Sequence, residues 1–167
     1  MSTNTQFAAI KWIKNELLIS IKQARVLLEG IQTSFNHESL EKFQSIVNTL
    51  SNNLELANDD VGSILCKELS EVAYFIRLEC ASESADSSVD DLMQGLVLLN
   101  DHIENISQGH RVDSREIGLI IDVFRKRQEK PCIQKSLLYV LDISNVKTSL
   151  ETKEENEPLS ILSLIHI

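Results

Sequence analysis

The sequence predicts an all-α protein, an antiparallel bundle of four or five helices. Apolar residues recur at alternating steps of three and four, which is the period of an amphipathic helix and not of a strand. The chain also has only 5 glycines, 2 prolines and 5% aromatic residues, whereas a β-sandwich needs many turn residues and β-branched runs. Its 167 residues are enough for one domain with a sizeable core.

The first predicted helix covers residues 8–30 and has one apolar stripe along about six turns. The stripe consists of Ile10, Ile13, Leu17, Ile21, Ala24, Leu28 and Ile31. Charged residues such as Lys11 and Lys14 fall off the stripe and keep the opposite side of the helix in water. Trp12 is next to the stripe, so it either packs at the seam between helices, which its position favours, or anchors a partner protein.

The second and third predicted helices are separated by a polar interruption. Asn36 suits the N-cap of the second helix, and acidic residues in its first turns favour the helix dipole. Its stripe consists of Leu40, Phe43, Val47, Leu50 and Leu54. The triplet Asn58-Asp59-Asp60 breaks the pattern and is expected to cap the third helix, where the dipole explains both carboxylates without catalysis or metal. The third stripe consists of Val61, Ile64, Leu65, Leu69, Val72 and Phe75.

Two further helices follow a small, polar, acidic segment at residues 81–86, which is a loop by composition. Ser87 with Asp90 resembles a capping box that opens the fourth helix, which should stop near Gly109. Its stripe consists of Val89, Leu92, Met93, Leu96, Leu99, Ile103 and Ile106. Asp113 repeats the cap pattern for a fifth helix, which we expect to end at Lys130-Pro131. The apolar residues of this helix are Ile117, Ile120, Ile121 and Phe124.

Charge and cysteine usage exclude several classes of partner. The net charge is −9, and the acidic residues are concentrated between residues 36 and 91. An acidic bundle is repelled by nucleic acid phosphates and by anionic lipids, so neither is an expected partner. The 3 cysteines lack metal-ligand spacing and indicate reduced thiols in the cytoplasm. No apolar run reaches the length of a membrane span, so membrane insertion is not expected.

Several segments resemble one family of signalling proteins. "IKWIKNEL" and "IKQARVLLEG" in the first helix resemble the opening helix of CheA-type chemosensory histidine kinases of the type IV pilus and twitching motility pathway (the ChpA/PilL type). "DDLMQGLVLLNDHIENI" and residues 117–130 resemble later helices of the same N-terminal region. The resemblance covers residues 7–145 and extends to the FimL-type pilus scaffold proteins. It implies a histidine phosphotransfer (Hpt)-like bundle in the cytoplasm, with or without recruitment to the cell pole.

The same resemblance locates the phosphoacceptor position of an Hpt module, which needs a histidine followed one turn later by a small residue. The matching positions are occupied by Asn48 and Asn52. A carboxamide nitrogen has its lone pair delocalised into the carbonyl and cannot form a phosphoramidate, and Asn52 crowds the approach of a partner. The resemblance therefore implies a phosphorylation-incompetent docking or scaffold domain with no catalytic residue, cofactor or metal, within a parent protein that is a histidine kinase.

The expected partners are proteins: a response-regulator receiver, a kinase core or pilus-hub proteins. The residues expected to bind them are Lys11, Trp12, Lys14, Asn48, Leu50 and Asn52. Two alternatives remain, a free-standing FimL-like scaffold without a kinase, and an active phosphotransfer domain that uses His102. Because His102 lies beside the apolar stripe without a small residue one turn on, we expect it to be a surface or boundary histidine.

The predicted domain organisation has three parts. Residues 1–131 form the helical bundle, and residues 132–161 are a linker or the start of a missing region. Residues 162–167 can be back-translated as CTGTCTCTTATACACATC, which looks like a transposon end used in sequencing libraries. We expect this tail to be adapter sequence at a truncated C-terminus, with a genuine apolar tail as the alternative.

Overall fold

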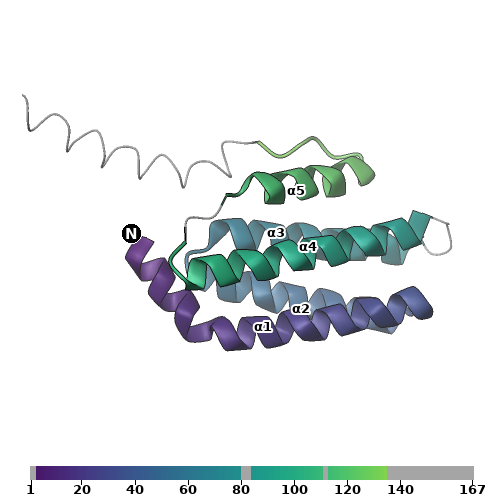
Figure 1. Ribbon diagram of the computed structural model, residues 1–167. Coiled ribbons are helices and arrows are strands. Elements are labelled where there is room, and N and C mark those ends of the chain that lie inside the picture. The colour runs from purple at the N-terminus through teal and green to yellow at the C-terminus, as the bar shows by residue number, and fades with distance from the viewer. Residues whose placement is uncertain (1–2, 80–83, 111–112, 135–167) are drawn as a thin grey trace, which may run out of the picture. The chain divides into compact units, whose positions relative to one another are not determined.

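A computed structural model describes residues 3–79, 84–110 and 113–134, and helices dominate these three ranges. The helices are α1 (Thr3–Thr33), α2 (His37–Leu56), α3 (Asp60–Glu79), α4 (Ser84–Ser107) and α5 (Arg115–Arg127) (Figure 1). No strand occurs in the described ranges. The prediction of an all-α helical bundle is confirmed.

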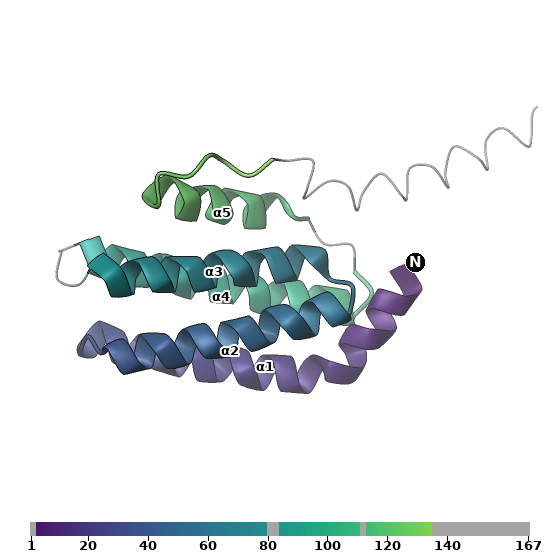
Figure 2. The same ribbon diagram turned by 180° about the vertical axis from the view of Figure 1, so that it is seen from behind.

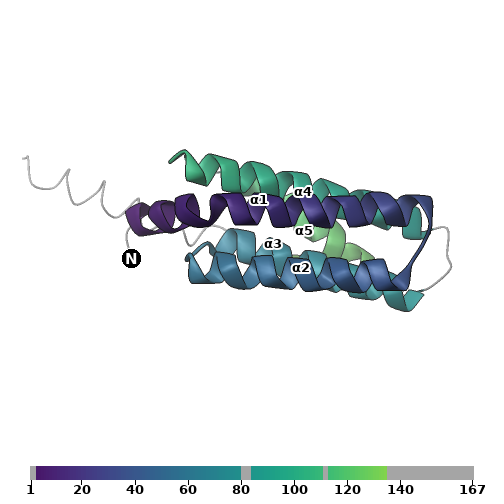
Figure 3. The same ribbon diagram turned by 90° about the horizontal axis from the view of Figure 1, so that it is seen from below.

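The first four helices form a closed ring in which each helix packs on the next and α4 returns to α1. Successive helices run in opposite directions (Figures 1 and 3). Helix α5 packs on α3 and α4, on the side of the bundle away from α1 and α2 (Figure 2). The architecture is therefore a four-helix antiparallel bundle with a fifth helix packed against α3 and α4.

The apolar stripes meet in the centre of this ring. Leu17 and Leu28 of α1, Phe43 of α2 and Leu69 of α3 are almost completely excluded from solvent. Gly95 of α4 lets three helices approach closely, because a Cβ there would lie 2.7 Å from Leu69 Cδ2 and 3.0 Å from Phe124 Cζ of α5. The buried residues of α5 therefore belong to the same hydrophobic core as those of the ring.

Helix ends follow recurring cap geometry. Asn36 caps α2 as predicted, since its side chain accepts a 2.8 Å hydrogen bond from the Glu38 amide. Helices α2, α4 and α5 are each followed by a residue with positive φ, namely Asn58 (59°), Gly109 (75°) and Glu129 (54°). The amide after each of these residues donates to the carbonyl five residues earlier at 2.8 or 2.9 Å, which is the Schellman arrangement.

Several predicted helix boundaries are wrong. Helix α1 runs from Thr3 to Thr33 and is longer at both ends than the predicted residues 8–30. Helix α4 begins at Ser84, so Ser87 lies in its first turn and is not the cap. Residues 84–87 contain no glycine or proline that would prevent this extra turn. The N-cap of α5 is Ser114 and not Asp113, and the helix ends at Arg127, ahead of Lys130-Pro131. The left-handed Glu129 has already reversed the chain there.

The compact unit that contains the bundle runs from Met1 to Ile133. Ile133 is buried, and its amide donates to Asp122 Oδ1 at 2.9 Å. A second unit, Gln134 to Ile167, lies outside the described residues except for Gln134. The predicted linker and adapter tail fall almost entirely in that unit.

Candidate functional site

The two asparagines at the proposed phosphoacceptor position lie on the outer surface of α2. Both Asn48 and Asn52 are exposed, as expected for a surface that a partner could reach. Asn48 follows Gln44 by one turn, and Gln44 Nε2 donates to the Ser70 carbonyl of α3 at 3.3 Å. Asn48 therefore lies on the flank of α2 that faces α3.

The sequence predicts that Leu50 binds a partner on the same surface, and this prediction is wrong. Its side chain is 0% exposed and belongs to the core. Leu50 lies three residues after Val47 and four before Leu54, so it continues the buried stripe of α2. Asn48 and Asn52 are one turn apart and project from the exposed side of the helix. A partner cannot touch Leu50 without opening the bundle.

The residues proposed on α1 have different environments. Trp12 is 89% exposed, so the expectation of burial is wrong. It is five positions before the buried Leu17, which places Trp12 about 140° around the helix from the core side. Lys11 is exposed, with Nζ 5.6 Å from the ring centroid of Phe7. Lys14 instead forms an ion pair with Glu104 of α4 and contributes to packing within the bundle.

The most unusual polar contact is inside the bundle, where His102 of α4 meets Asp59 at the start of α3. His102 Nε2 lies 2.9 Å from Asp59 Oδ1 and 2.8 Å from Oδ2. Asp59 is completely buried and His102 is 4% exposed, so the expectation of a surface or boundary histidine is wrong. The other ring nitrogen, Nδ1, is also buried and has no hydrogen-bond partner among the described residues.

Local structure holds Asp59 in this position. The left-handed Asn58 turns the chain inward, and Asp59 Oδ1 accepts from the Gly62 amide at 3.3 Å in the first turn of α3. A Cβ at Gly62 would lie 2.5 Å from Asp59 Oδ2, so the carboxylate occupies space that only glycine leaves open. Burial, and to a smaller extent the Asp59 charge, raises the pKa of the nearby Cys66 thiol. The cluster ties the α2–α3 turn to α4.

Sequence reasoning missed this pair because its two members are 43 residues apart. The helix dipole accounts for the position of Asp59 before α3 but not for its burial. The apolar residues that precede and follow His102, Leu99 and Ile103, were the signal that could have indicated an inward orientation.

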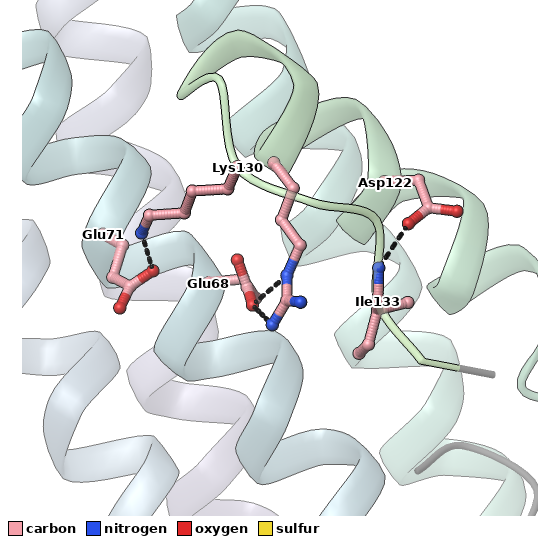
Figure 4. A network of polar contacts seen from close by, with 6 residues as sticks. Glu68, Glu71, Asp122, Lys130 and Ile133 are labelled. Atoms are coloured by element: carbon pink, nitrogen blue, oxygen red, sulfur yellow. Dashed lines mark hydrogen bonds and ion pairs between the residues drawn. The ribbon is translucent and has the colours of Figure 1, made fainter. Parts of the chain in front are cut away.

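Helix α5 buries its apolar stripe against the ring. Ion pairs also attach α5 and the residues that follow it to α3 (Figure 4). Arg125 Nε donates to Glu68 Oε1 of α3 at 2.7 Å, and Lys130 Nζ donates to Glu71 Oε2 at 2.6 Å. Arg127 Nε lies 2.6 Å from Asp91 Oδ2 of α4. The basic segment around residues 125–127 thus neutralises part of the acidic surface of α3 and α4.

A groove of about 770 Å³ follows the junction between α1 and α2. Its lining residues are Ile19, Lys22, Gln23, Val26, Leu27, Lys42, Ser45 and Ile46. These residues are apolar, neutral polar or cationic, and no carboxylate is among them. In a chain with a net charge of −9, this is a locally basic and apolar surface.

Comparison with known proteins found no matching protein-family model, no matching curated protein and no matching solved structure. The family resemblance of the sequence therefore stays a prediction. Within the described ranges, none of the helices combines the length and apolar character that a membrane crossing requires. The same ranges contain no group of three or more histidine, cysteine, aspartate or glutamate residues arranged to hold a metal ion.

Proposed function

We propose that this chain is an Hpt-like docking domain that binds phosphorelay proteins but does not itself carry phosphate, as in the N-terminal region of a chemosensory histidine kinase of the type IV pilus pathway. The observation that carries the proposal is the placement of the imidazoles. Among the described residues, no histidine is exposed in the middle of a helix: His37 is the first residue of α2, His110 follows α4, and His102 is buried.

Phosphotransfer requires a ring nitrogen with an accessible lone pair. His102 Nε2 is engaged by both oxygens of Asp59, Nδ1 is buried, and the residue as a whole is 4% exposed. A phosphoryl donor would have to separate α3 from α4 to reach it. These contacts support the incompetent domain over the alternative in which His102 is the phosphoacceptor.

The surface of the bundle supports a docking role. Trp12 exposes a large aromatic side chain, and such side chains anchor many protein interfaces. The groove between α1 and α2 presents apolar side chains beside two lysines. In this proposal the domain works in the cytoplasm, and its partners are a receiver, a kinase core or a pilus-hub protein.

Binding of the full chain to the kinase core and to the receiver of a type IV pilus chemosensory system tests the proposal. We expect a Kd of about 1–100 μM for at least one of them, measured by isothermal titration calorimetry. Asn48→Arg with Asn52→Arg should weaken this binding about 10-fold or more. The control Leu119→Arg, at an exposed position of α5, should leave it unchanged. Absence of binding to every phosphorelay protein would contradict the proposal.

A further inference from the structure

Exposed apolar side chains on α1 recur at intervals of seven residues. Trp12, Ile19 and Val26 are 89%, 58% and 59% exposed. Seven residues are close to two helical turns, so these side chains lie on one face of α1. Exposed apolar residues at this interval are typical of a surface that receives another helix.

The groove beside this face contains two positively charged side chains, Lys22 and Lys42. Lys22 has no ion-pair partner in the described part of the chain. Lys42 pairs with Glu38 on its own helix, with Nζ 2.6 Å from Oε1 and both side chains more than half exposed. Such an exposed pair exchanges easily for another carboxylate. The groove therefore favours a ligand with apolar residues in its centre and carboxylates at its edges.

The chain itself shows how a helix docks on this bundle. Helix α5 packs against both α3 and α4 and buries Ile117, Ile121 and Phe124. Its cationic end meets the carboxylates of Glu68 and Asp91. Helices α1 and α2 lie on the side of the ring opposite α5 (Figures 1 and 2). The groove along their junction is lined by lysines, whereas the α3 and α4 side chains that receive α5 include carboxylates.

We infer that the groove between α1 and α2 binds an acidic amphipathic helix of a partner protein. The inference deepens the proposed function and rests on it, because it names the class of partner that the docking domain accepts. A second copy of this chain fits less well. Its exposed apolar helix is α5, with Leu119 and Val123, and the exposed Lys126 lies on the same helix, whereas Arg125 and Arg127 are already paired with Glu68 and Asp91. Docking of α5 would therefore bring the positive charge of Lys126, and no free run of carboxylates, to the lysines.

The probe for this site is a designed 18-residue helical peptide without tryptophan, with leucines along one face and glutamates beside them. Trp12 is the chain's single tryptophan, so its fluorescence reports on this face of the intact protein. We expect saturable binding with a shift of Trp12 emission to shorter wavelength. A peptide in which lysines replace the glutamates should bind at least 10-fold more weakly.

Two pairs of variants test the site itself. Lys22→Glu with Lys42→Glu should weaken binding of the acidic peptide at least 10-fold. Lys67→Glu with Lys126→Glu changes the net charge equally at exposed positions outside the groove and should have little effect. Likewise, Ile19→Ser with Val26→Ser should abolish binding, whereas Leu119→Ser with Val123→Ser should not.

Three results would overturn the inference. The first is equal affinity of the chain for the acidic and the lysine-containing peptide, and the second is equal affinity of the groove variants and the control variants for the acidic peptide. The third is a dimer of the chain in analytical ultracentrifugation that Ile19→Ser with Val26→Ser abolishes. The outcomes also separate this inference from the proposed function. Peptide binding at the groove without binding to phosphorelay proteins would refute the proposed function alone. Phosphorelay binding that the groove variants leave intact, with no peptide binding, would refute the inference alone.

Discussion

His102 Nε2 lies within 2.9 Å of both carboxylate oxygens of Asp59, and neither side chain has significant contact with solvent. The contact joins the turn between α2 and α3 to the C-terminal half of α4. Buried polar groups are costly when they lose their partner, so each side chain depends on the other.

Asp59→Ala should lower the free energy of unfolding by about 2–4 kcal/mol, because it leaves His102 buried without its partner and removes a contact to the start of α3. Asp60→Ala is the matched control, since Asp60 is the next residue and is exposed. Its loss should cost about 0.3–1 kcal/mol through the helix dipole. Urea denaturation measures both values, and equal destabilisation would show that the buried pair has no special role.

Gly62→Ala should also destabilise the protein, by about 1–3 kcal/mol, because its new Cβ would meet Asp59 Oδ2 at 2.5 Å and Leu54 Cδ1 at 3.1 Å. Gly30→Ala provides the comparison, since nothing lies within 4 Å of a Cβ at that position in α1. The alanine there should stabilise the fold by about 0.5 kcal/mol through helix propensity. Opposite signs of the two changes in thermal midpoint are expected, and a neutral Gly62→Ala would contradict the packing described for Asp59.

The ion pairs of α5 predict a local effect. Arg125→Ala should leave the buried Glu68 carboxylate without its cation and cost about 2 kcal/mol. Hydrogen exchange in α5 should accelerate more than exchange in α2. Lys126→Ala, at an exposed position on the same helix, should change neither rate. Uniform acceleration throughout the bundle would indicate that α5 does not open separately.

The cysteines should differ strongly in reactivity. Cys66 is buried, and burial together with the Asp59 charge raises the pKa of its thiol above the ordinary 9.0, which keeps it neutral. A raised pKa means that its contribution to stability is complete below pH 9.0 and is lost only as the pH rises toward the folded-state value. At pH 8, iodoacetamide should modify the exposed Cys132 at least about 100-fold faster than Cys66. Mass spectrometry of the alkylated peptides measures the ratio, which should disappear in denaturant, and fast alkylation of native Cys66 would contradict its burial.

Much of the fold could be predicted because it depends on local sequence periodicity. The stripe from Leu40 to Leu54 and the cap at Asn36 were both identified from the sequence, and the structure has them as expected. The positions that failed depend on neighbours remote in sequence. Trp12 lies outside the contact between α1 and its neighbouring helices. His102 contacts Asp59 only because α4 packs beside the start of α3. Helix α4 begins at Ser84 and not at Ser87, because residues 84–87 contain no glycine or proline that would exclude them from the helix.

The candidate site was predictable only as far as exposure follows from the helical wheel. Asn48 and Asn52 are on the surface, but Leu50 between them belongs to the core stripe of the same helix. The groove between α1 and α2 could not be predicted, because it is formed by side chains such as Ile19 and Ile46 that come together only when two helices pack.

The most direct test of the central claim is a phosphotransfer measurement on the full chain. The chain is incubated with the kinase core of a type IV pilus chemosensory system and γ-labelled ATP, and acid-labile, base-stable label is counted. We expect no label on the unmodified chain, because Asn48 cannot form a phosphoramidate and His102 is buried. Asn48→His with Asn52→Gly should gain label. Strong labelling of the unmodified chain that His102→Gln abolishes would contradict the account.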